Sequence, residues 1–349
     1  MAYNSTELPI TDKLVDRQRD ALYNYDPNSQ KDINAKRPWE QNPTYFKTVR
    51  VSSVALTKMV MHAREGGSIE VMGMMQGYVD GTSIVVTDAF RLPVEGTETR
   101  VNAQGEADEY LVNYLDLCRK ESRLENIVGW YHSHPGYGCW LSGIDVETQK
   151  LQQLQGPMVA VVIDPNRTVS ANKVEIGAFR TYPDWYNPPD QLGSTTGGSG
   201  PAGAGTTVPL SKTMDYGAHA NKYYRLEVEH FKSTLDTRLL DLLWNKYWVQ
   251  TLAQNPLLSN RDYSSSNMDD VGQRVQEIAV NVSRMGKGML HYHYLGGSSS
   301  LGGVNTSGPK AVDQSIEKAV QDVGQIAAKE RAGLLAAEVK AQIFGQGGV

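Results

Sequence analysis

Residues 127–155 constrain the fold more than any other part of the chain, because they predict a strand, a loop and a helix in immediate succession. Ile127–Tyr131 is mostly apolar and runs directly into His132 and His134. Side chains two residues apart on a strand point to the same face, so the two imidazoles can share one ligand, whereas Ser133 points away. We therefore expect the chemistry of this protein at the end of this strand.

A loop and a helix follow the strand. Pro135 and the glycines after it end the strand in a loop. Ser142 is a favourable helix N-cap, and it predicts a helix that runs to about Gln155 and stops before a proline. The loop can therefore carry Asp145, in the first turn of this helix, back towards the two histidines.

The two imidazoles and this carboxylate form a ligand set for one zinc ion. Catalytic zinc sites have three protein ligands and an open fourth position, whereas structural sites have four protein ligands. The spacing alone is a weak signal, because paired histidines on a strand are more often ordinary polar residues. The same spacing recurs at His291 and His293. No carboxylate or cysteine follows there and Gly and Ser are frequent nearby, so we expect that pair at a surface or interface.

The run His-Ser-His-Pro, followed by Ser-x-x-Asp, resembles the motif of the JAMM (MPN+) metalloproteases. The resemblance implies that His132, His134 and Asp145 hold one zinc ion. It also implies that Ser142 donates a hydrogen bond to the oxyanion that develops during hydrolysis.

The same family requires a glutamate near the start of the domain, which acts as general base on water. Glu70 matches that requirement. It interrupts the apolar run 69–75, where a carboxylate costs several kcal/mol in desolvation unless it is paired or lies at a metal. The alternative is that Glu70 is an exposed residue on an edge strand.

Composition excludes several classes of function. The chain has 349 residues, of which 40% are hydrophobic, and a net charge of −5, so it can bury a substantial core. No dense Lys/Arg run is present, so we expect no nucleic-acid partner. No stretch is apolar and long enough to span a membrane. The N-terminus lacks the pattern of a signal peptide, and Cys118 and Cys139 are the only cysteines, so we expect a protein of a reducing compartment. Cytoplasm and nucleus are the expected locations.

Cys139 lies close to His134, which raises the alternative of a cysteine hydrolase. The same loop already supplies metal ligands, and Cys139 is flanked by Trp140 and Leu141. A small buried hydrophobic residue is therefore the favoured interpretation of Cys139.

The periodicity predicts an α/β domain with a mixed central sheet and helices on both faces, which is consistent with the MPN (JAMM, cytidine-deaminase-like) fold that the resemblance implies. Around it we expect a polar N-terminal arm, anchored by Trp39 and Phe46, a Gly/Ser/Pro linker and a helical assembly region. The expected boundaries are 1–44 for the arm, 45–186 for the catalytic domain, 187–221 for the linker and 222–349 for the helical region.

Apolar spacing predicts the individual elements. The expected helices cover residues 54–64, 107–120, 222–253, 268–285 and 312–344, and the expected strands cover 69–79, 83–92, 158–163 and 173–179. The last helix carries a narrow apolar stripe with few partners in its own chain. We expect it to join a bundle with other subunits, although a local hairpin is the alternative.

Three further segments, 58–64, 93–104 and 242–248, resemble the catalytic subunits of the COP-nine signalosome, the fifth or Jab subunits. That resemblance implies a deneddylase, which removes a NEDD-type ubiquitin-like modifier from cullins by hydrolysing the isopeptide bond. It implies two kinds of partner: the neddylated cullin, and other signalosome subunits bound through the C-terminal helices. Met74, Met75 and Gln76 depart from the Leu-rich stretch that is usual in relatives.

Two alternatives remain at this stage. The deubiquitinase of the proteasome lid shares the histidine run but lacks the segment Glu-Gly-Thr-Glu-Thr-Arg-Val-Asn. A metal-free MPN scaffold subunit belongs to another class, but such subunits lose metal ligands and this chain keeps them.

Relatives use the segment 95–104 to gate the site. The resemblance therefore implies that Glu98, or a contact made by Thr99 and Arg100, holds the segment over the metal until a partner favours an open form. A solvated turn is the alternative interpretation of this segment.

Overall fold

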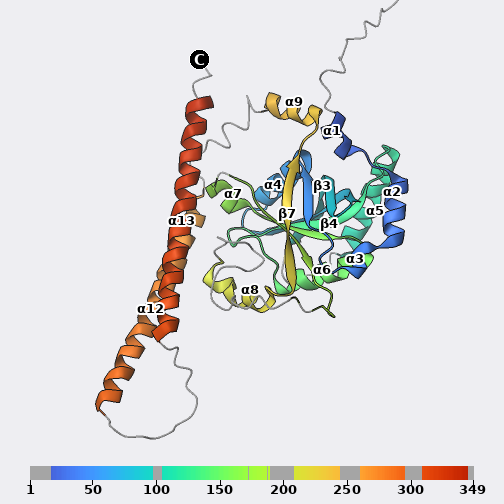
Figure 1. Cartoon of the computed structure of the whole chain (residues 1–349). Helices are drawn as coiled ribbons and strands as arrows, with labels where there is room; N and C mark the ends of the chain where they lie inside the picture. The colour runs from blue at the N-terminus through green and yellow to red at the C-terminus, as the bar shows by residue number, and fades with distance from the viewer. Residues whose placement is uncertain are drawn as a thin grey trace, which may run out of the picture.

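The computed structural model describes residues 17–96, 104–171, 173–186, 188, 208–243, 260–294 and 309–344. The predicted gating residues Glu98, Thr99 and Arg100 lie outside these residues. The described chain forms a rounded α/β unit and a long helical hairpin beside it (Figure 1).

A single mixed sheet organises the α/β unit, and it closes on itself in the order β1-β3-β2-β4-β5-β6-β7. β1 is parallel to both β3 and β7, β4 is parallel to β5, and the other neighbours are antiparallel. The strands are β1 (Thr48–Ser52), β2 (Glu70–Asp80), β3 (Ser83–Gly96), β4 (Asn126–Ser133), β5 (Val159–Asp164), β6 (Glu175–Thr181) and β7 (Tyr223–Phe231).

The core lies on both faces of this sheet, as alternate residues of β5 show. Val159, Val161 and Ile163 join one apolar cluster, whereas Ala160 and Val162 join another. All residues of β5 are buried, which is the pattern of a strand covered on both faces. The continuous apolar run at 158–163 predicted this central strand.

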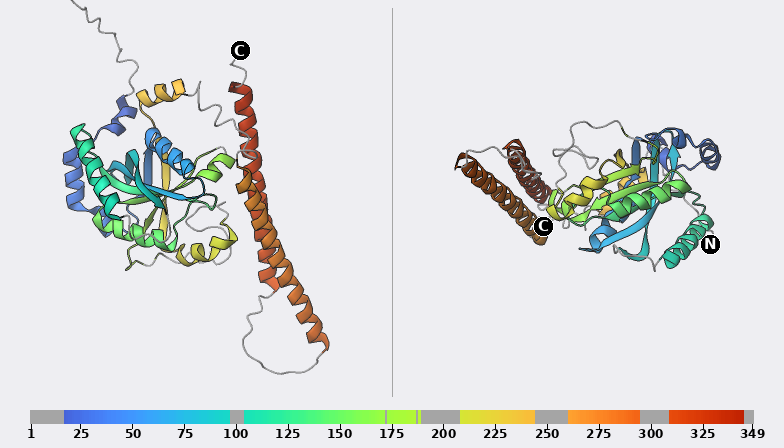
Figure 2. Two further views of the ribbon diagram at one scale, coloured as in Figure 1. Left: turned by 180° about the vertical axis from the view of Figure 1, so that it is seen from behind. Right: turned by 90° about the horizontal axis from the view of Figure 1, so that it is seen from below.

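Helices cover both sides of the sheet and form the hairpin (Figure 2). Helix α4 contributes to the first cluster, and its N-cap is Ser52, whose side chain accepts a hydrogen bond from the amide of Ala55. The helical elements are α1 (Arg17–Asp20), η2 (Ala21–Tyr23), α2 (Pro27–Lys36), α3 (Pro38–Gln41), α4 (Ser53–Glu65), α5 (Gln104–Lys120), α6 (Gly143–Gln155), α7 (Pro165–Ala171), η3 (Leu210–Lys212), α8 (Thr213–His219), α9 (Thr234–Leu243), α12 (Arg261–Tyr294) and α13 (Pro309–Phe344). None of the helices in the described residues combines the length and apolar character that a bilayer span requires.

The described part of the N-terminal arm packs on the α/β unit. Trp39 stacks on the buried Phe46 at a centroid separation of 5.7 Å. Nε2 of the Gln30 side chain donates to the backbone carbonyl of Val79 at 2.8 Å, and its Oε1 accepts from the backbone amide of Val79 at 3.0 Å. Gln30 therefore satisfies both backbone groups of Val79, as a neighbouring strand would.

The prediction of one helix over 222–253 was wrong. Residues Tyr223–Phe231 form strand β7, which lies between β1 and β6, and α9 begins only at Thr234. The physical reason is the alternation of Tyr224, Leu226 and Val228, which all face the first core cluster. The boundary at 222 therefore removes a strand of the sheet from the catalytic domain.

The predicted linker 187–221 also ends too late. Residues 208–219 form η3 and α8, and Val208 is buried against Trp140, with Tyr216 packed beside it. These apolar side chains give the end of the segment a place on the domain, which its Gly/Ser/Ala composition did not reveal.

The hairpin of α12 and α13 includes the segments 268–285 and 312–344 that the periodicity predicted as helical, and also His291 and His293. Arg274 of α12 forms an ion pair with Asp322 of α13 at 2.8 Å. Helix α13 lies on α7 of the α/β unit, where Gly333 meets the backbone of Ser170. One side of the hairpin thus has a partner within its own chain.

Candidate active site

The end of β4 brings together the three residues that the sequence marks as metal ligands. Nε2 of His132 lies 3.0 Å from Nε2 of His134. Oδ2 of Asp145 lies 3.4 Å from the first nitrogen and 3.6 Å from the second. One nitrogen or oxygen from each side chain therefore points at a common centre.

The start of α6 fixes the position of Asp145. Asp145 is the third helical residue after the N-cap Ser142, and the two form a capping box. Both the backbone amide and the hydroxyl of Ser142 donate to Oδ2 of Asp145, at 2.8 and 2.7 Å. Ser142 thus orients the carboxylate oxygen that faces the histidines.

Burial and mutual attraction set the charges of this group. Burial tends to raise the pKa of the Asp145 carboxyl, but attraction and hydrogen bonding to His132 and His134 outweigh it and hold the pKa well below its usual value. Burial lowers the pKa of His134, helped by repulsion from His132 and against its hydrogen bond to Asp145. Burial also tends to lower the pKa of His132, but attraction to Asp145, and less strongly to Glu70, outweighs burial and leaves this pKa raised.

His134 is in the right tautomer to bind a metal. Its Nδ1 lies 3.0 Å from the carbonyl oxygen of Gly138, which can only accept, so Nδ1 carries the proton and Nε2 presents its lone pair. Because the pKa of His134 is lowered, the ring is neutral at pH 7, as a metal ligand must be.

The spacing of the three ligand atoms fits a small tetrahedral ion. Two ligands that are each about 2.0–2.1 Å from a tetrahedral zinc ion lie about 3.3 Å apart. The separations between the atoms of His132, His134 and Asp145 are 3.0, 3.4 and 3.6 Å. These residues therefore fit the zinc site implied by their chemistry.

Glu70 lies at the start of β2, next to this centre. The neighbouring amide of Val71 donates to Oγ of Ser133 at 2.9 Å, which ties the end of β2 to the end of β4. The hydroxyl of Tyr137 donates to Oε1 of Glu70. The ring of Tyr137 stacks on His134 at a centroid separation of 4.4 Å.

Tyr137 is the contributor to this site that sequence reasoning missed. It lies between Gly136 and Gly138 in the loop that follows the histidines, and no apolar period or ligand type marks it. The available signal was its place between two glycines, which mark positions where the backbone takes angles that few other residues adopt; both glycines have positive φ, 90° and 89°.

The segment 208–219 supports the same loop from outside. Trp140 packs with Val208, and its ring lies edge-on to Tyr216 at 5.7 Å. Asp215 accepts a hydrogen bond from the amide of Gly143 at 3.2 Å. The segment that the sequence predicted to be part of a linker therefore buttresses the start of α6.

Cys139 is buried and free. Burial, together with the charges of Asp164 and Glu175, raises the pKa of its thiol. A nucleophilic cysteine needs a lowered pKa, so the geometry favours the metal centre over a cysteine hydrolase.

Comparison with known proteins agrees with the sequence motifs. Residues 44–157 match the family described as JAB1/Mov34/MPN/PAD-1 ubiquitin protease, and residues 253–345 match the C-terminal domain of Cop9 signalosome subunit 5.

Full-length relatives are similar over nearly the whole chain. The COP9 signalosome complex subunit 5 of Neurospora crassa is 61% identical, over 98% of this chain and 96% of the relative. The protein of the same name from Aspergillus fumigatus is 57% identical, with the same two shares. Subunit 5b of Arabidopsis thaliana is 49% identical, over 96% and 88%. The chain therefore belongs to the family of COP9 signalosome subunit 5, with a JAMM-type isopeptidase domain.

Proposed function

We propose that this chain is a zinc-dependent isopeptidase that removes a NEDD-type ubiquitin-like modifier from cullins, as the catalytic subunit of a signalosome. The observation that carries the proposal is the convergence of two imidazoles and one carboxylate beside Glu70. The names of the full-length relatives support the signalosome assignment.

The ligand residues have the simplest role. His132, His134 and Asp145 hold the ion, with Ser142 and the carbonyl of Gly138 orienting two of them. When bound, zinc supplies Lewis acidity, which polarises the isopeptide carbonyl and lowers the pKa of water at the open position.

Glu70 moves the proton. Its carboxylate accepts a proton from the attacking water and returns it to the lysine amine as the C–N bond breaks. The hydroxyl of Tyr137 donates to Oε1 of Glu70 and so helps to orient this carboxylate. Ser142 is the proposed donor to the oxyanion; to act so, its hydroxyl must leave Asp145 while its backbone amide remains on that carboxylate.

Substitution of the proposed base tests this function. In an assembled signalosome, Glu70→Gln should keep zinc and slow cleavage of a cullin conjugate by about 10²- to 10⁴-fold, the usual contribution of general acid–base catalysis. Glu65→Gln is the matched control, because Glu65 is exposed and pairs with Arg91. His134→Ala and Asp145→Asn should instead lower zinc content. Undiminished cleavage by the Glu70 variant would overturn the assignment.

Substrate choice separates the two hydrolase alternatives. The proposal expects faster cleavage of the cullin conjugate than of a ubiquitin chain by the same preparation. The reverse order would favour an activity of the proteasome-lid type, and failure to bind zinc would favour a scaffold.

Gating by Glu98, Thr99 and Arg100 remains part of the proposal. An anionic side chain on this segment can occupy the open position of the metal, so the isolated chain should be slow. Glu98→Ala should raise cleavage of a small modifier substrate at constant zinc content. If the isolated wild type is already as fast as the assembled complex, the segment serves substrate recognition instead.

A further inference from the structure

Asp164, at the end of β5, is a buried carboxylate that the reaction described above does not use. Its side chain has no exposed surface. Oδ1 accepts hydrogen bonds from the amides of Gly136 at 3.0 Å and Arg167 at 2.9 Å, and Oδ2 accepts from the amide of Gly138 at 2.8 Å. One carboxylate therefore holds the loop between β4 and α6, which we call the catalytic loop, on both sides of Tyr137.

That loop carries two contacts of the active site. The carbonyl of Gly138 fixes the tautomer of His134, and Tyr137 holds Glu70. Gly136 and Gly138 both have left-handed backbone angles, which few other residues adopt. The hydrogen bonds to Asp164 select one conformation from the many that two glycines allow.

Arg167 supports Asp164 from the other side. Its Nε lies 3.2 Å from Oδ2 of Asp164 and 3.4 Å from the carbonyl oxygen of Gly136. The side chain of Arg167 is 5% exposed, so the ion pair is almost completely shielded from water. A buried charge pair of this kind depends on the groups that surround it.

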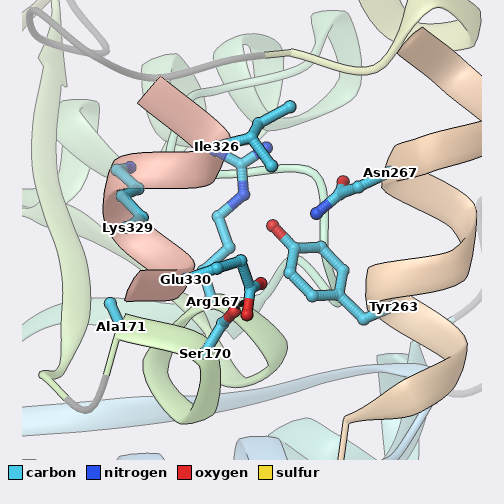
Figure 3. A pocket seen from close by; sticks show the side chains of 8 residues that line it. All are labelled: Arg167, Ser170, Ala171, Tyr263, Asn267, Ile326, Lys329 and Glu330. Carbon is cyan, nitrogen blue, oxygen red and sulfur yellow. Dashed lines mark hydrogen bonds between the residues drawn. The ribbon is translucent and has the colours of Figure 1, made fainter. Parts of the chain in front are cut away.

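The helical hairpin supplies those surroundings (Figure 3). Tyr263 of α12 and Glu330 of α13 line, with Arg167, a cavity of about 20 Å³, which has room for about one water molecule. The ring of Tyr263 also lies against Gly136, because a Cβ built on that glycine would come within 3.0 Å of Cδ2.

Further contacts clamp α7, the helix that carries Arg167. The side-chain amide of Asn260 donates to the carbonyl of Asn166 at 2.6 Å. The hydroxyl of Ser170 donates to Glu330. Gly333 lets α13 approach the backbone of α7 so closely that a Cβ there would meet the carbonyl oxygen of Ser170.

We propose that Asp164 and Arg167 are positioning residues for the isopeptidase site, and that the seating of the α12–α13 hairpin on α7 holds them in place. The inference rests on the proposed function. By this inference the hairpin also positions the active site, in addition to any role in assembly. A displacement of α13 would shift α7 and Asp164, and through the catalytic loop it would move His134 and Glu70.

Two substitutions in α13 of the full-length chain form a matched test. Gly333→Ala should lift α13 from α7, whereas Gly324→Ala lies on the same helix with open space around it. The first readout is amide hydrogen exchange of Gly136 and Gly138 in the metal-free chain. Gly333→Ala should speed both amides several-fold, and Gly324→Ala should leave both at the wild-type rate.

Asp164→Asn tests the carboxylate directly, with Asp80→Asn, which removes an exposed carboxylate, as control. We expect exchange of the two glycine amides to be at least tenfold faster and zinc, measured by chelator competition, to bind about tenfold more weakly, as when hydrogen bonds that orient metal ligands are lost. If this variant does not fold, the Gly333 and Gly324 pair decides the proposal alone.

Wild-type exchange rates at Gly136 and Gly138 in Gly333→Ala, or unchanged exchange and zinc affinity in a folded Asp164→Asn, would overturn the inference. Failure of the proposed function has a different signature, because wild type itself would then neither bind zinc nor cleave a conjugate. The exchange rates report on the loop in either case.

Discussion

The α/β unit and the C-terminal hairpin differ in how many of their apolar side chains they bury. Phe46, Met75 and Trp140 are among the largest side chains that the α/β unit buries completely or almost completely. In the hairpin, Leu335 and Val339 of α13 remain 61% and 52% exposed. The comparison teaches that the first region has a core of its own, although it also leaves Leu151 and Leu154 exposed, whereas Ala337 is the only apolar side chain that is buried among the described residues of the hairpin.

Truncation should give the largest contrast between the two regions. A chain that ends after Leu243 keeps all strands of the described residues, β1 to β7, and should fold, because the α/β unit stays intact. A chain that ends at Asn221 lacks β7, and therefore Tyr223 and Leu226, which are both buried, as well as the pairing of β1 and β6 with β7. That loss is comparable with the whole stability of about 5–15 kcal/mol of a typical protein.

Circular dichroism during heating measures the outcome. A cooperative transition in the chain that ends at Asn221 would show that β7 is dispensable. It would then be wrong to count this strand as part of the α/β unit.

A pair of single truncations should give the next largest effect. Phe46→Ala should lower the free energy of unfolding by about 3–5 kcal/mol, because it opens a cavity beneath Trp39. Leu335→Ala should change it by less than about 0.5 kcal/mol, because that side chain is mostly exposed. Urea unfolding of both variants measures the difference, and similar midpoints would break the comparison.

Polar substitution in the hairpin tests what its exposed surface is for. Leu335 and Val339 are four residues apart, so they lie side by side on α13. Leu335→Ser with Val339→Ser should leave the thermal transition of the isolated chain unchanged and weaken capture by other signalosome subunits, by about 2 kcal/mol or more if the pair is a binding hot spot. Gln342→Ser is a control at an exposed polar position of the same helix. Undiminished capture would assign assembly to another surface.

The smallest expected effect concerns a buried ionisable group of the α/β unit. Burial, with a contribution from Arg91, lowers the pKa of His62, whose Nδ1 lies 2.9 Å from the hydroxyl of Tyr131. As pH falls below about 6.5, the unfolded chain takes up a proton before the folded chain does. The free energy of unfolding should therefore decrease as the pH is lowered through this window, by at most about 1.4 kcal/mol per pH unit from one group.

Urea unfolding at pH 7.5, 6.5 and 5.5 tests this effect. His62→Gln should flatten the dependence relative to wild type. Parallel curves for the two proteins would mean that His62 contributes nothing to it.

Local patterns predicted much of this structure. The apolar spacing over 54–64 predicted α4, and the run 158–163 predicted β5, because each signal lies within the element that it specifies. The sequence also predicted that His132, His134 and Asp145 lie near one another, since strand, loop and helix are consecutive, and their ligand atoms do come together in the structure.

Distant pairing could not be predicted in this way. Strand β7 alternates Tyr224, Leu226 and Val228 with charged residues, a local signal that the expected helix over 222–253 overlooked. Its partner strands were not predictable from that pattern, because the pairing with β1, which joins Glu227 to Thr48, links residues far apart in sequence. The hydrogen bond from Tyr137 to Glu70 likewise joins residues far apart in sequence, and no local period contains it.

Closure of the sheet by its last strand has a consequence for biosynthesis. A ribosome adds about 5–20 residues each second, so Thr48 and its neighbours emerge many seconds before Phe231, to which Ser52 is paired. Until β7 is made, β1 and β6 each have one edge without a partner strand, and the residues 208–219 that support the catalytic loop follow only shortly before β7. The nascent chain therefore acquires a complete hydrolytic centre late in its own translation, after the segments that support that centre have been made.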